Sequence, residues 1–222
     1  MTPKALLFDL GGALIDIDFD LAYQAWSRHS ALPLGTLRQH FLFDTPYERH
    51  ERDEIAADEY FAHLTSALQL TATPDQVVAG WNAIFRGEIA ATLERVAQAR
   101  RSLPCYVLTN TNATHMACWA ARFPRVATGF DRIFASHEIG RRKPEPAAFD
   151  HVCRVTGCHP EALLFFDDTP ANVDAAASYG LPSVLVRGAS WSFLPLPAPA
   201  RRPLGAAVSC VSSGGGQSRH KG

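Results

Sequence analysis

The sequence predicts an α/β fold: a Rossmann-like parallel five-stranded sheet flanked by helices, with a small helical cap inserted after the first strand. Short apolar runs end in polar residues and alternate with helical segments, which is typical of a buried parallel sheet. About a hundred residues separate the first run from the second, far more than a crossover helix requires, so an additional module is expected there. The 222 residues are 47% hydrophobic, enough for one full core and such a module.

Five apolar runs are the predicted strands, and a polar residue follows each of them. The runs are residues 4–8, 105–108, 133–135, 163–166 and 183–186. The residues that follow them are Asp9, Thr109, Ser136, Asp167 and Arg187. Because ligands bind outside the carboxyl ends of the strands in an open parallel sheet, we expect these polar positions to converge on one crevice.

The inserted segment has the composition of a helical module. Aromatic and aliphatic residues recur at helical spacing, and prolines separate the predicted helices, which are residues 19–30, 34–41, 55–70 and 75–85. A further predicted helix, residues 88–101, returns the chain to the second strand.

These elements predict the domain organisation. The core comprises residues 1–16 and 88–190, and the cap comprises residues 17–87. Residues 191–222 are rich in Pro, Ser and Gly and cannot bury enough apolar surface to offset ordering, so they predict a disordered tail.

Composition and charge favour a small-molecule partner. Lys and Arg total 21 against 22 Asp and Glu, so no global field attracts nucleic acid or an anionic membrane surface. The apolar N-terminal stretch is interrupted at once by Asp9, which argues against a secretory signal or a membrane-spanning helix. Five scattered cysteines argue against a disulfide framework and predict reduced thiols in the cytoplasm. We expect no nucleic-acid or membrane partner, and the sequence leaves the oligomeric state open.

The first of four motifs, residues 7–14, places Asp9 at the end of the first strand, with Gly11 and Gly12 just behind it. Glycines let the backbone approach a ligand closely, and a carboxylate there suits a nucleophile that attacks phosphorus beside a metal ion. The competing interpretation is an aspartate that only caps a turn, since Asp and Gly are common turn residues.

The second motif, residues 107–112, places the Thr109 hydroxyl and the Asn110 amide just before a predicted helix. A phosphate could accept hydrogen bonds there, because helix N-termini favour anions. Thr111 or Asn112 would also serve as an ordinary N-cap, and the two interpretations are compatible.

The third motif, residues 140–146, is a basic cluster ahead of a predicted helix at residues 146–155. Lys143, fixed by the proline that follows it, could neutralise a phosphoryl group and the charge that develops on it. Taken alone, the cluster is more simply interpreted as a solvated basic loop.

The fourth motif, residues 164–172, places Asp167 and Asp168 directly after an apolar strand. Adjacent carboxylates there are costly unless a cation or hydrogen bonds compensate them, and Mg²⁺, which prefers oxygen ligands, fits. The alternative is N-capping of a helix at residues 170–178 by Thr169 or Asp168.

In this order, the four motifs resemble the haloacid dehalogenase-like hydrolase superfamily over roughly residues 4–187. The family pattern is a nucleophilic Asp, a Ser or Thr after the second strand, a Lys and an acidic pair. The segments most similar to its α-D-glucose-1-phosphate phosphatase branch are residues 9–12, 16–19, 109–112, 142–145 and 165–168. The resemblance implies a Mg²⁺-dependent phosphatase, a phosphoric monoester hydrolase that acts on a small phosphorylated metabolite, such as a sugar phosphate, through a phosphoaspartate.

The resemblance also implies a role for each matching residue in catalysis. Asp9 attacks the phosphorus, and Lys143 bridges the phosphate and the nucleophile. Thr109 and Asn110 hold the phosphate.

For the metal, the resemblance implies Asp9, Asp168 and the backbone carbonyl of Gly11 as ligands, with Asp167 in support. Asn172 stands where many members have a further acid. We therefore expect Asn172 to act through water or to orient Asp168.

Gly11 departs from the family pattern, which has a second aspartate there as general acid and base. Loss of a positioned acid or base costs a factor of about 10² to 10⁴ in rate unless the leaving group is good or another residue substitutes. Two alternatives follow: a metal-independent dehalogenase-type hydrolase, and a catalytically weak protein that only binds phosphate esters. The acidic pair argues against the first, because a metal-free halide site would avoid such charge.

The cap is expected to select the substrate. Its most polar segment, residues 47–54, contains His50 and Glu51, which could offer hydrogen bonds to a sugar. A charge run at helical spacing is more often a solvated helix face, so that interpretation competes.

Overall fold

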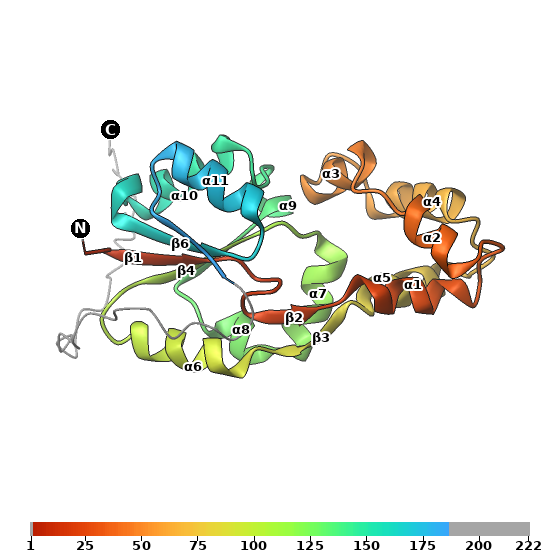
Figure 1. Ribbon diagram of the computed structural model, residues 1–222, viewed down its shortest axis with the longest axis horizontal. Coiled ribbons are helices and arrows are strands. Elements are labelled where there is room, and N and C mark those ends of the chain that lie inside the picture. Colours follow the sequence, from red (N-terminus) through yellow and green to blue (C-terminus); the bar gives the residue numbers. More distant parts are fainter. Residues whose placement is uncertain (1, 187–222) are drawn as a thin grey trace, which may run out of the picture.

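The computed structural model describes residues 2–186. Residue 1 and residues 187–222, which include the predicted tail of residues 191–222, lie outside the described part of the chain. Within residues 2–186 no helix combines the length and the apolar character needed to cross a lipid bilayer. Figure 1 shows a central sheet with helices on both faces and a second group of helices to one side.

All five predicted strands are present in one parallel sheet, which confirms the predicted fold class. They are β1 (Ala5–Phe8), β4 (Cys105–Thr109), β5 (Arg132–Ala135), β6 (Leu163–Asp167) and β7 (Ser183–Leu185). Their order across the sheet is β5-β4-β1-β6-β7, and every neighbouring pair is parallel. The chain builds outward from β1 through β4 on one side and through β6 on the other, so β1 lies at the switch point where such sheets bind ligands.

Both faces of the sheet are buried, because successive residues of β1 point to opposite sides. Leu6 and Phe8 belong to one apolar cluster, and Ala5 and Leu7 belong to another. Figure 1 shows α10 and α11 over one face and α6 and α8 over the other. The helices of this part of the chain are α6 (Ala90–Ala99), α7 (Ala113–Arg122), α8 (Pro124–Thr128), α9 (Ser136–Ile139), α10 (Pro146–Thr156) and α11 (Pro170–Tyr179), with a 3₁₀ turn at Pro160–Ala162.

Five helices lie beyond the carboxyl ends of the sheet strands (Figure 1), and we call them the cap helices. They are α1 (Phe19–Ser27), α2 (Leu34–His40), α3 (Thr45–Glu51), α4 (Ala57–Ala67) and α5 (Pro74–Asn82). They pack around Trp26, Tyr60 and Trp81, which are all buried. Helix α3 begins where the Asp44 carboxylate accepts a hydrogen bond from the Tyr47 amide at 3.0 Å. The domain boundaries near residues 17 and 87 stay a prediction.

A short antiparallel strand pair was missed by the sequence analysis. β2 (Ile15–Ile17) pairs with β3 (Phe85–Glu88) between the cap helices and the sheet. The predictions that one helix reached residue 85 and another began at residue 88 are therefore wrong: α5 ends at Asn82 and α6 begins at Ala90. Local periodicity could not show this, because the pairing partners are far apart in the sequence.

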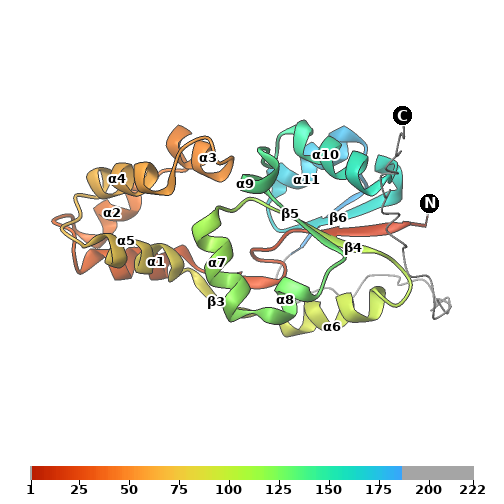
Figure 2. The same cartoon turned by 180° about the vertical axis from the view of Figure 1, so that it is seen from behind.

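Trp81 anchors the cap helices to α7, which Figure 2 shows beside α5. Its ring stacks on that of His115 with 4.3 Å between centroids, and His115 Nε2 donates a hydrogen bond to the Trp81 carbonyl at 3.0 Å. Burial lowers the pKa of His115 to about 3, so the imidazole is neutral at neutral pH. Asn112 caps α7, as one interpretation of the second motif predicted, by accepting a hydrogen bond from the His115 amide at 3.0 Å.

Candidate active site

Strands β1, β4 and β6 end at one cavity of about 430 Å³. The predicted site residues that line it are Asp9, Gly11, Glu51, Thr109, Asn110, Lys143, Asp168 and Asn172. The structure thus brings together side chains from four separate motifs, as the shared carboxyl edge of parallel strands requires.

Lys143 is the centre of the charge arrangement. Its ammonium nitrogen lies 2.5 Å from Asp9 Oδ1 and 2.6 Å from Asp167 Oδ2, and the residue is 1% exposed. The same nitrogen lies 5.5 Å from the centroid of the Phe165 ring. A buried charge persists only where it is paired in this way, so the interpretation of the third motif as a solvated loop is wrong.

Burial and neighbouring charges act in opposite directions on these groups. Burial raises the pKa of Asp9 to about 7, although Lys143 opposes this and Asp167 adds to it. Burial alone would lower the pKa of Lys143, but Asp9 and Asp167 together raise it above its ordinary value. The ammonium group is therefore charged at neutral pH, and it is available to compensate negative charge next to Asp9.

Asp167 is held in place rather than exposed to the cavity. Besides Lys143, its carboxylate accepts hydrogen bonds from the Thr169 amide at 2.8 Å and from the Asn172 side chain at 3.1 Å. The expectation that Asn172 orients Asp168 is not what the structure shows, because its amide contacts Asp167. Thr169 occupies the N-cap position of α11, as the capping alternative predicted, but its hydroxyl makes no capping hydrogen bond and donates instead to Asp168 Oδ1 at 3.2 Å.

Asp168 completes a group of carboxylates that suits a cation. Oxygen atoms of Asp9, Asp167 and Asp168 all lie within 4.8 Å of one another. One ammonium group faces three carboxylates, and no ion pair within residues 2–186 includes Asp168. Burial and the charge of Asp167 raise the pKa of Asp168. Hard oxygen ligands with excess negative charge are the donor set that Mg²⁺ prefers.

Gly12 allows Asp168 to approach the loop after β1. Gly12 has a φ of +69°, and a Cβ atom there would lie 1.9 Å from Asp168 Oδ2. We predict that Gly12→Ala displaces the Asp168 carboxylate, weakens Mg²⁺ binding at least tenfold and lowers the free energy of unfolding by about 2–4 kcal/mol.

A matched control separates the steric effect from backbone strain. Gly157 has nearly the same φ, +67°, but nothing lies within 4 Å of an added Cβ. Gly157→Ala should therefore cost only the strain, about 1–2 kcal/mol, and leave Mg²⁺ affinity unchanged. Urea unfolding and calorimetric Mg²⁺ titration measure both, and equal losses in the two variants would contradict the clash with Asp168.

Asn110 holds the loop that carries Lys143. Its side-chain oxygen accepts a hydrogen bond from the Lys143 amide, and its side-chain nitrogen donates to the Lys143 carbonyl, both at 2.8 Å. The side-chain amide of Asn110 can therefore contact a phosphate, as predicted, only if these two hydrogen bonds with Lys143 break.

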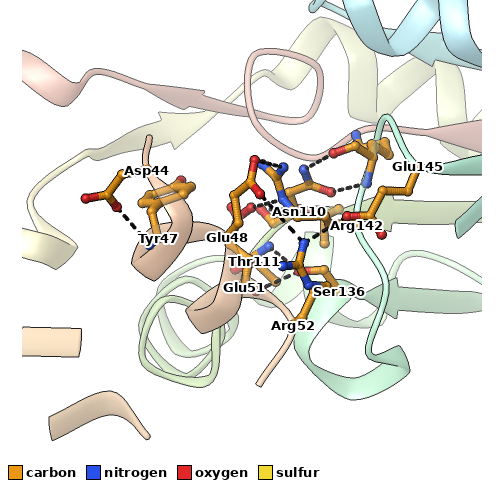
Figure 3. Close-up of polar contacts among 12 residues, drawn as sticks. Asp44, Tyr47, Glu48, Glu51, Arg52, Asn110, Thr111, Ser136, Arg142 and Glu145 are labelled. Atoms are coloured by element: carbon orange, nitrogen blue, oxygen red, sulfur yellow. Dashed lines mark hydrogen bonds and ion pairs between the residues drawn. The ribbon is translucent and has the colours of Figure 1, made fainter. Parts of the chain in front are cut away.

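Ser136 is also structural, since it exchanges hydrogen bonds with the backbone of Thr111 at 2.8 and 2.9 Å (Figure 3). Arg187, the fifth predicted strand-end residue, lies outside the described part of the chain.

Helix α3 contacts the Lys143 loop through ion pairs, which Figure 3 shows. Arg142 Nε lies 2.8 Å from Glu51 Oε2, and Arg142 Nη1 lies 3.0 Å from Glu48 Oε1. Arg52 Nη1 lies 2.8 Å from Glu145 Oε1. Glu51 is 3% exposed, so the interpretation of this segment as a solvated face is wrong at that position.

His50 lies inside the cap helices and does not line the cavity. Its ring stacks on Tyr60 with 4.5 Å between centroids, and it is 4% exposed. Burial lowers its pKa to about 4, so it is neutral at neutral pH. The structure therefore separates the two predicted substrate-selecting residues, and only Glu51 faces the site.

Ile17, Phe43 and Arg142 also line the cavity, and the sequence analysis assigned no individual role to them. Phe43 is 60% exposed, which is unusual for a large apolar ring. The basic character of residues 140–146 was visible, but only the structure shows which cation is buried against Asp9 and which faces Glu51.

The chain belongs to the haloacid dehalogenase-like hydrolase family, whose model matches residues 3–180. This agrees with the parallel sheet and with the carboxylates and lysine at its edge.

Characterised relatives cover most of the chain. A D-ribitol-5-phosphate phosphatase of Bacteroides thetaiotaomicron is 26% identical over 85% of this chain and 94% of its own length. Phosphatase MT3486 of Mycobacterium tuberculosis is 26% identical over 84% of this chain and 88% of its own length. The crystal structure of the family enzyme BT-2542 from B. thetaiotaomicron, in complex with magnesium and inorganic phosphate, is similar with a TM-score of 0.74 at 25% identity, covering 84% of this chain and 95% of that one.

Proposed function

We propose that this protein hydrolyses a small phosphomonoester with Mg²⁺ as cofactor and with Asp9 as a transiently phosphorylated nucleophile. It is a phosphoric monoester hydrolase of the haloacid dehalogenase-like family. The observation that carries the assignment is the pairing of the Asp9 carboxylate with a fully buried ammonium group, Lys143, beside the carboxylate of Asp168, which forms no ion pair within residues 2–186. Relatives of similar length are named as phosphatases, which supports the same class.

Asp9, Asp168 and the backbone carbonyl of Gly11 would hold the magnesium ion. The fit rests on the cluster of three carboxylates around one ammonium group. When bound, Mg²⁺ supplies positive charge that stabilises the phosphoryl oxygens in the transition state. Asp167 and Asn172 support the site through their mutual hydrogen bonds.

Each of the remaining site residues has a separate role in the proposed reaction. The Asp9 carboxylate attacks phosphorus, and Lys143 compensates the charge on both the nucleophile and the phosphoryl group. The Thr109 hydroxyl, which lies at the end of β4 and lines the cavity, binds a phosphoryl oxygen. Asn110 acts by fixing the backbone of Lys143.

The cavity suits a compact substrate such as a sugar or polyol phosphate. Its volume of about 430 Å³ accommodates one small metabolite, and both polar and apolar side chains line it. An α-D-glucose 1-phosphate-type substrate agrees with the motif resemblance, and a polyol phosphate agrees with the named activity of the B. thetaiotaomicron relative. Cytoplasmic metabolites of this kind are the proposed substrate class.

The carboxylate cluster opposes the dehalogenase alternative. A metal-independent site would leave Asp9, Asp167 and Asp168 within 4.8 Å of one another with only Lys143 to compensate them. Phosphate release that requires Mg²⁺ therefore separates the two reactions.

The test is a phosphate-release screen over sugar, polyol and aryl phosphates, with Mg²⁺ or with EDTA. We predict turnover that falls at least a hundredfold in EDTA and returns when Mg²⁺ is added. Turnover that is indifferent to EDTA, or binding of phosphate esters without any release of phosphate, would overturn the proposal.

A further inference from the structure

Hydrolysis of an alkyl phosphate needs a proton donor that the groups assigned so far do not supply. The leaving oxygen must be protonated, and a water molecule must later lose a proton to attack the phosphoaspartate. Gly11 has no side chain to do this. Asp9 is the nucleophile, and Asp168 is assigned to the metal.

One carboxyl group that lines the cavity serves neither as the nucleophile nor as a metal ligand. The titratable side chains of that cavity are Asp9, Tyr47, Glu51, Arg142, Lys143 and Asp168. Lys143 is committed to Asp9 and Asp167, and burial raises the pKa of Tyr47 well above its ordinary value. Among the described residues that line the cavity, only Glu51 is a carboxylic acid with no role assigned so far in nucleophilic attack or in holding the metal.

Glu51 also lies on the side of the cavity where the proton is needed. Asp9 follows a strand of the sheet, whereas Glu51 ends α3 of the cap helices, so the two residues line the same cavity from different layers of the structure. In an in-line displacement the leaving oxygen departs opposite to the attacking oxygen. A phosphoryl group bound to Asp9 therefore directs its leaving group toward the cap helices.

The surroundings of Glu51 hold its carboxyl group in a fixed orientation. Arg142 Nε donates a hydrogen bond to Glu51 Oε2 at 2.8 Å (Figure 3). The side chain of Glu51 is 4% exposed. Burial raises the pKa of Glu51, while Arg142, the hydrogen bond with Tyr47 and the more distant Lys143 lower it. Burial thus favours the protonated carboxyl group and Arg142 favours the carboxylate, and a general acid and base needs both forms.

We propose that Glu51 is the general acid and base of the reaction, in place of the side chain that Gly11 lacks; this rests on the proposed phosphatase function. In the first step the Asp9–phosphorus bond forms, the bond from phosphorus to the leaving oxygen breaks, and that oxygen takes the proton of the Glu51 carboxyl group. In the second step water attacks phosphorus, its proton passes to the Glu51 carboxylate, and the Asp9 carboxylate leaves with its electron pair. Phosphate is released, and both side chains return to their initial state.

The test compares Glu51→Gln with Glu48→Gln on esters whose leaving groups differ. Glu48 binds the same arginine from the adjacent turn of α3 but does not line the cavity, so Glu48→Gln controls for the loss of an Arg142 ion pair. For an alkyl phosphate, kcat/KM should fall about 10² to 10⁴-fold in Glu51→Gln. For 4-nitrophenyl phosphate, whose leaving group needs no proton, kcat/KM should fall by less than about threefold. Glu48→Gln should change either value by less than about threefold.

The second step gives an independent readout. In Glu51→Gln, kcat for 4-nitrophenyl phosphate should fall and the phosphorylated enzyme should accumulate, because the attacking water has lost its base. Adding Gly11→Asp to Glu51→Gln should restore the alkyl-phosphate rate, since an added Cβ at Gly11 meets only the end of the flexible Ile17 side chain, at 2.7 Å.

The outcomes distinguish the two proposals. Wild-type protein that releases no phosphate from any ester overturns the proposed function itself. If the wild-type protein is active but Glu51→Gln lowers kcat/KM equally for alkyl and aryl esters, only the role of Glu51 is overturned. If Glu51→Gln fails to fold by circular dichroism, Glu51→Asp provides the same comparison, with a selective loss of about tenfold expected for the alkyl ester.

Discussion

Lys143→Met should unfold at much lower denaturant concentration than the wild-type protein and lose its phosphatase activity. The substitution keeps an unbranched side chain, one atom shorter, but removes the ammonium group that lies between Asp9 and Asp167. Two carboxylates then remain in a buried site without compensation, which costs about 3–5 kcal/mol of unfolding free energy. The phosphoryl group also loses its cationic contact, which lowers kcat by at least about 10² to 10³-fold.

Two further variants separate charge from packing. Arg141→Met removes the neighbouring cation, which donates to the Ile139 carbonyl and does not line the cavity, and it should change the free energy of unfolding by less than about 0.5 kcal/mol. Adding Asp167→Asn to Lys143→Met removes one of the uncompensated charges and should recover part of the stability but none of the activity. If the double variant is as unstable as Lys143→Met, packing rather than charge explains the loss.

The sequence predicted the sheet and the position of the site well, because both depend on local patterns. Each predicted strand is a short run of largely apolar residues that can be recognised without knowledge of distant partners, and the central strand β1 is buried along its whole length. Once the strands are parallel, Asp9 and Thr109 must lie at the same edge of the sheet. The four-motif resemblance then added Lys143 and Asp168, which are brought to the same cavity by loops whose course the sequence does not show.

The sequence could not predict the pairing of distant strands or the directions in which neighbouring helical side chains point. The β2 and β3 pairing joins segments on either side of the cap helices. His50 and Glu51 are neighbours in one helix, and successive helical residues point about 100° apart. One side chain therefore stacks on Tyr60 inside the cap helices while the other faces the cavity, although both belong to the same polar run.

The partners of the amide side chains were also beyond the sequence. Asn110 and Asn172 occur in motifs that suggest contact with phosphate or metal. The side chain of Asn110 instead forms hydrogen bonds with the backbone of Lys143, and that of Asn172 donates to the Asp167 carboxylate. Such contacts position the groups that perform the chemistry. Their loss would therefore displace those groups rather than remove a direct contact with the substrate or the metal.

Asp9→Asn should lose activity as Lys143→Met does, but without the loss of stability. Removing a catalytic nucleophile lowers kcat by about 10⁴-fold or more, and no phosphorylated enzyme should form with any ester. Burial raises the pKa of Asp9 to about 7, which means that its ionised form is less stable in the folded protein than in the unfolded chain. Asparagine removes this penalty, while Lys143 keeps its partner Asp167 at 2.6 Å.

The free energy of unfolding of Asp9→Asn at pH 7.5 without Mg²⁺ should therefore equal that of the wild-type protein or exceed it by about 1–3 kcal/mol. With Mg²⁺ the order should reverse, because only the wild-type protein retains the full set of carboxylates and gains stability by binding the ion. Urea unfolding with and without Mg²⁺, together with acid-quench trapping of phosphorylated protein, measures both effects. A loss of stability as large as that of Lys143→Met, or a trapped phosphoryl group in Asp9→Asn, would show that the nucleophile and its pairing with Lys143 have been assigned to the wrong carboxylate.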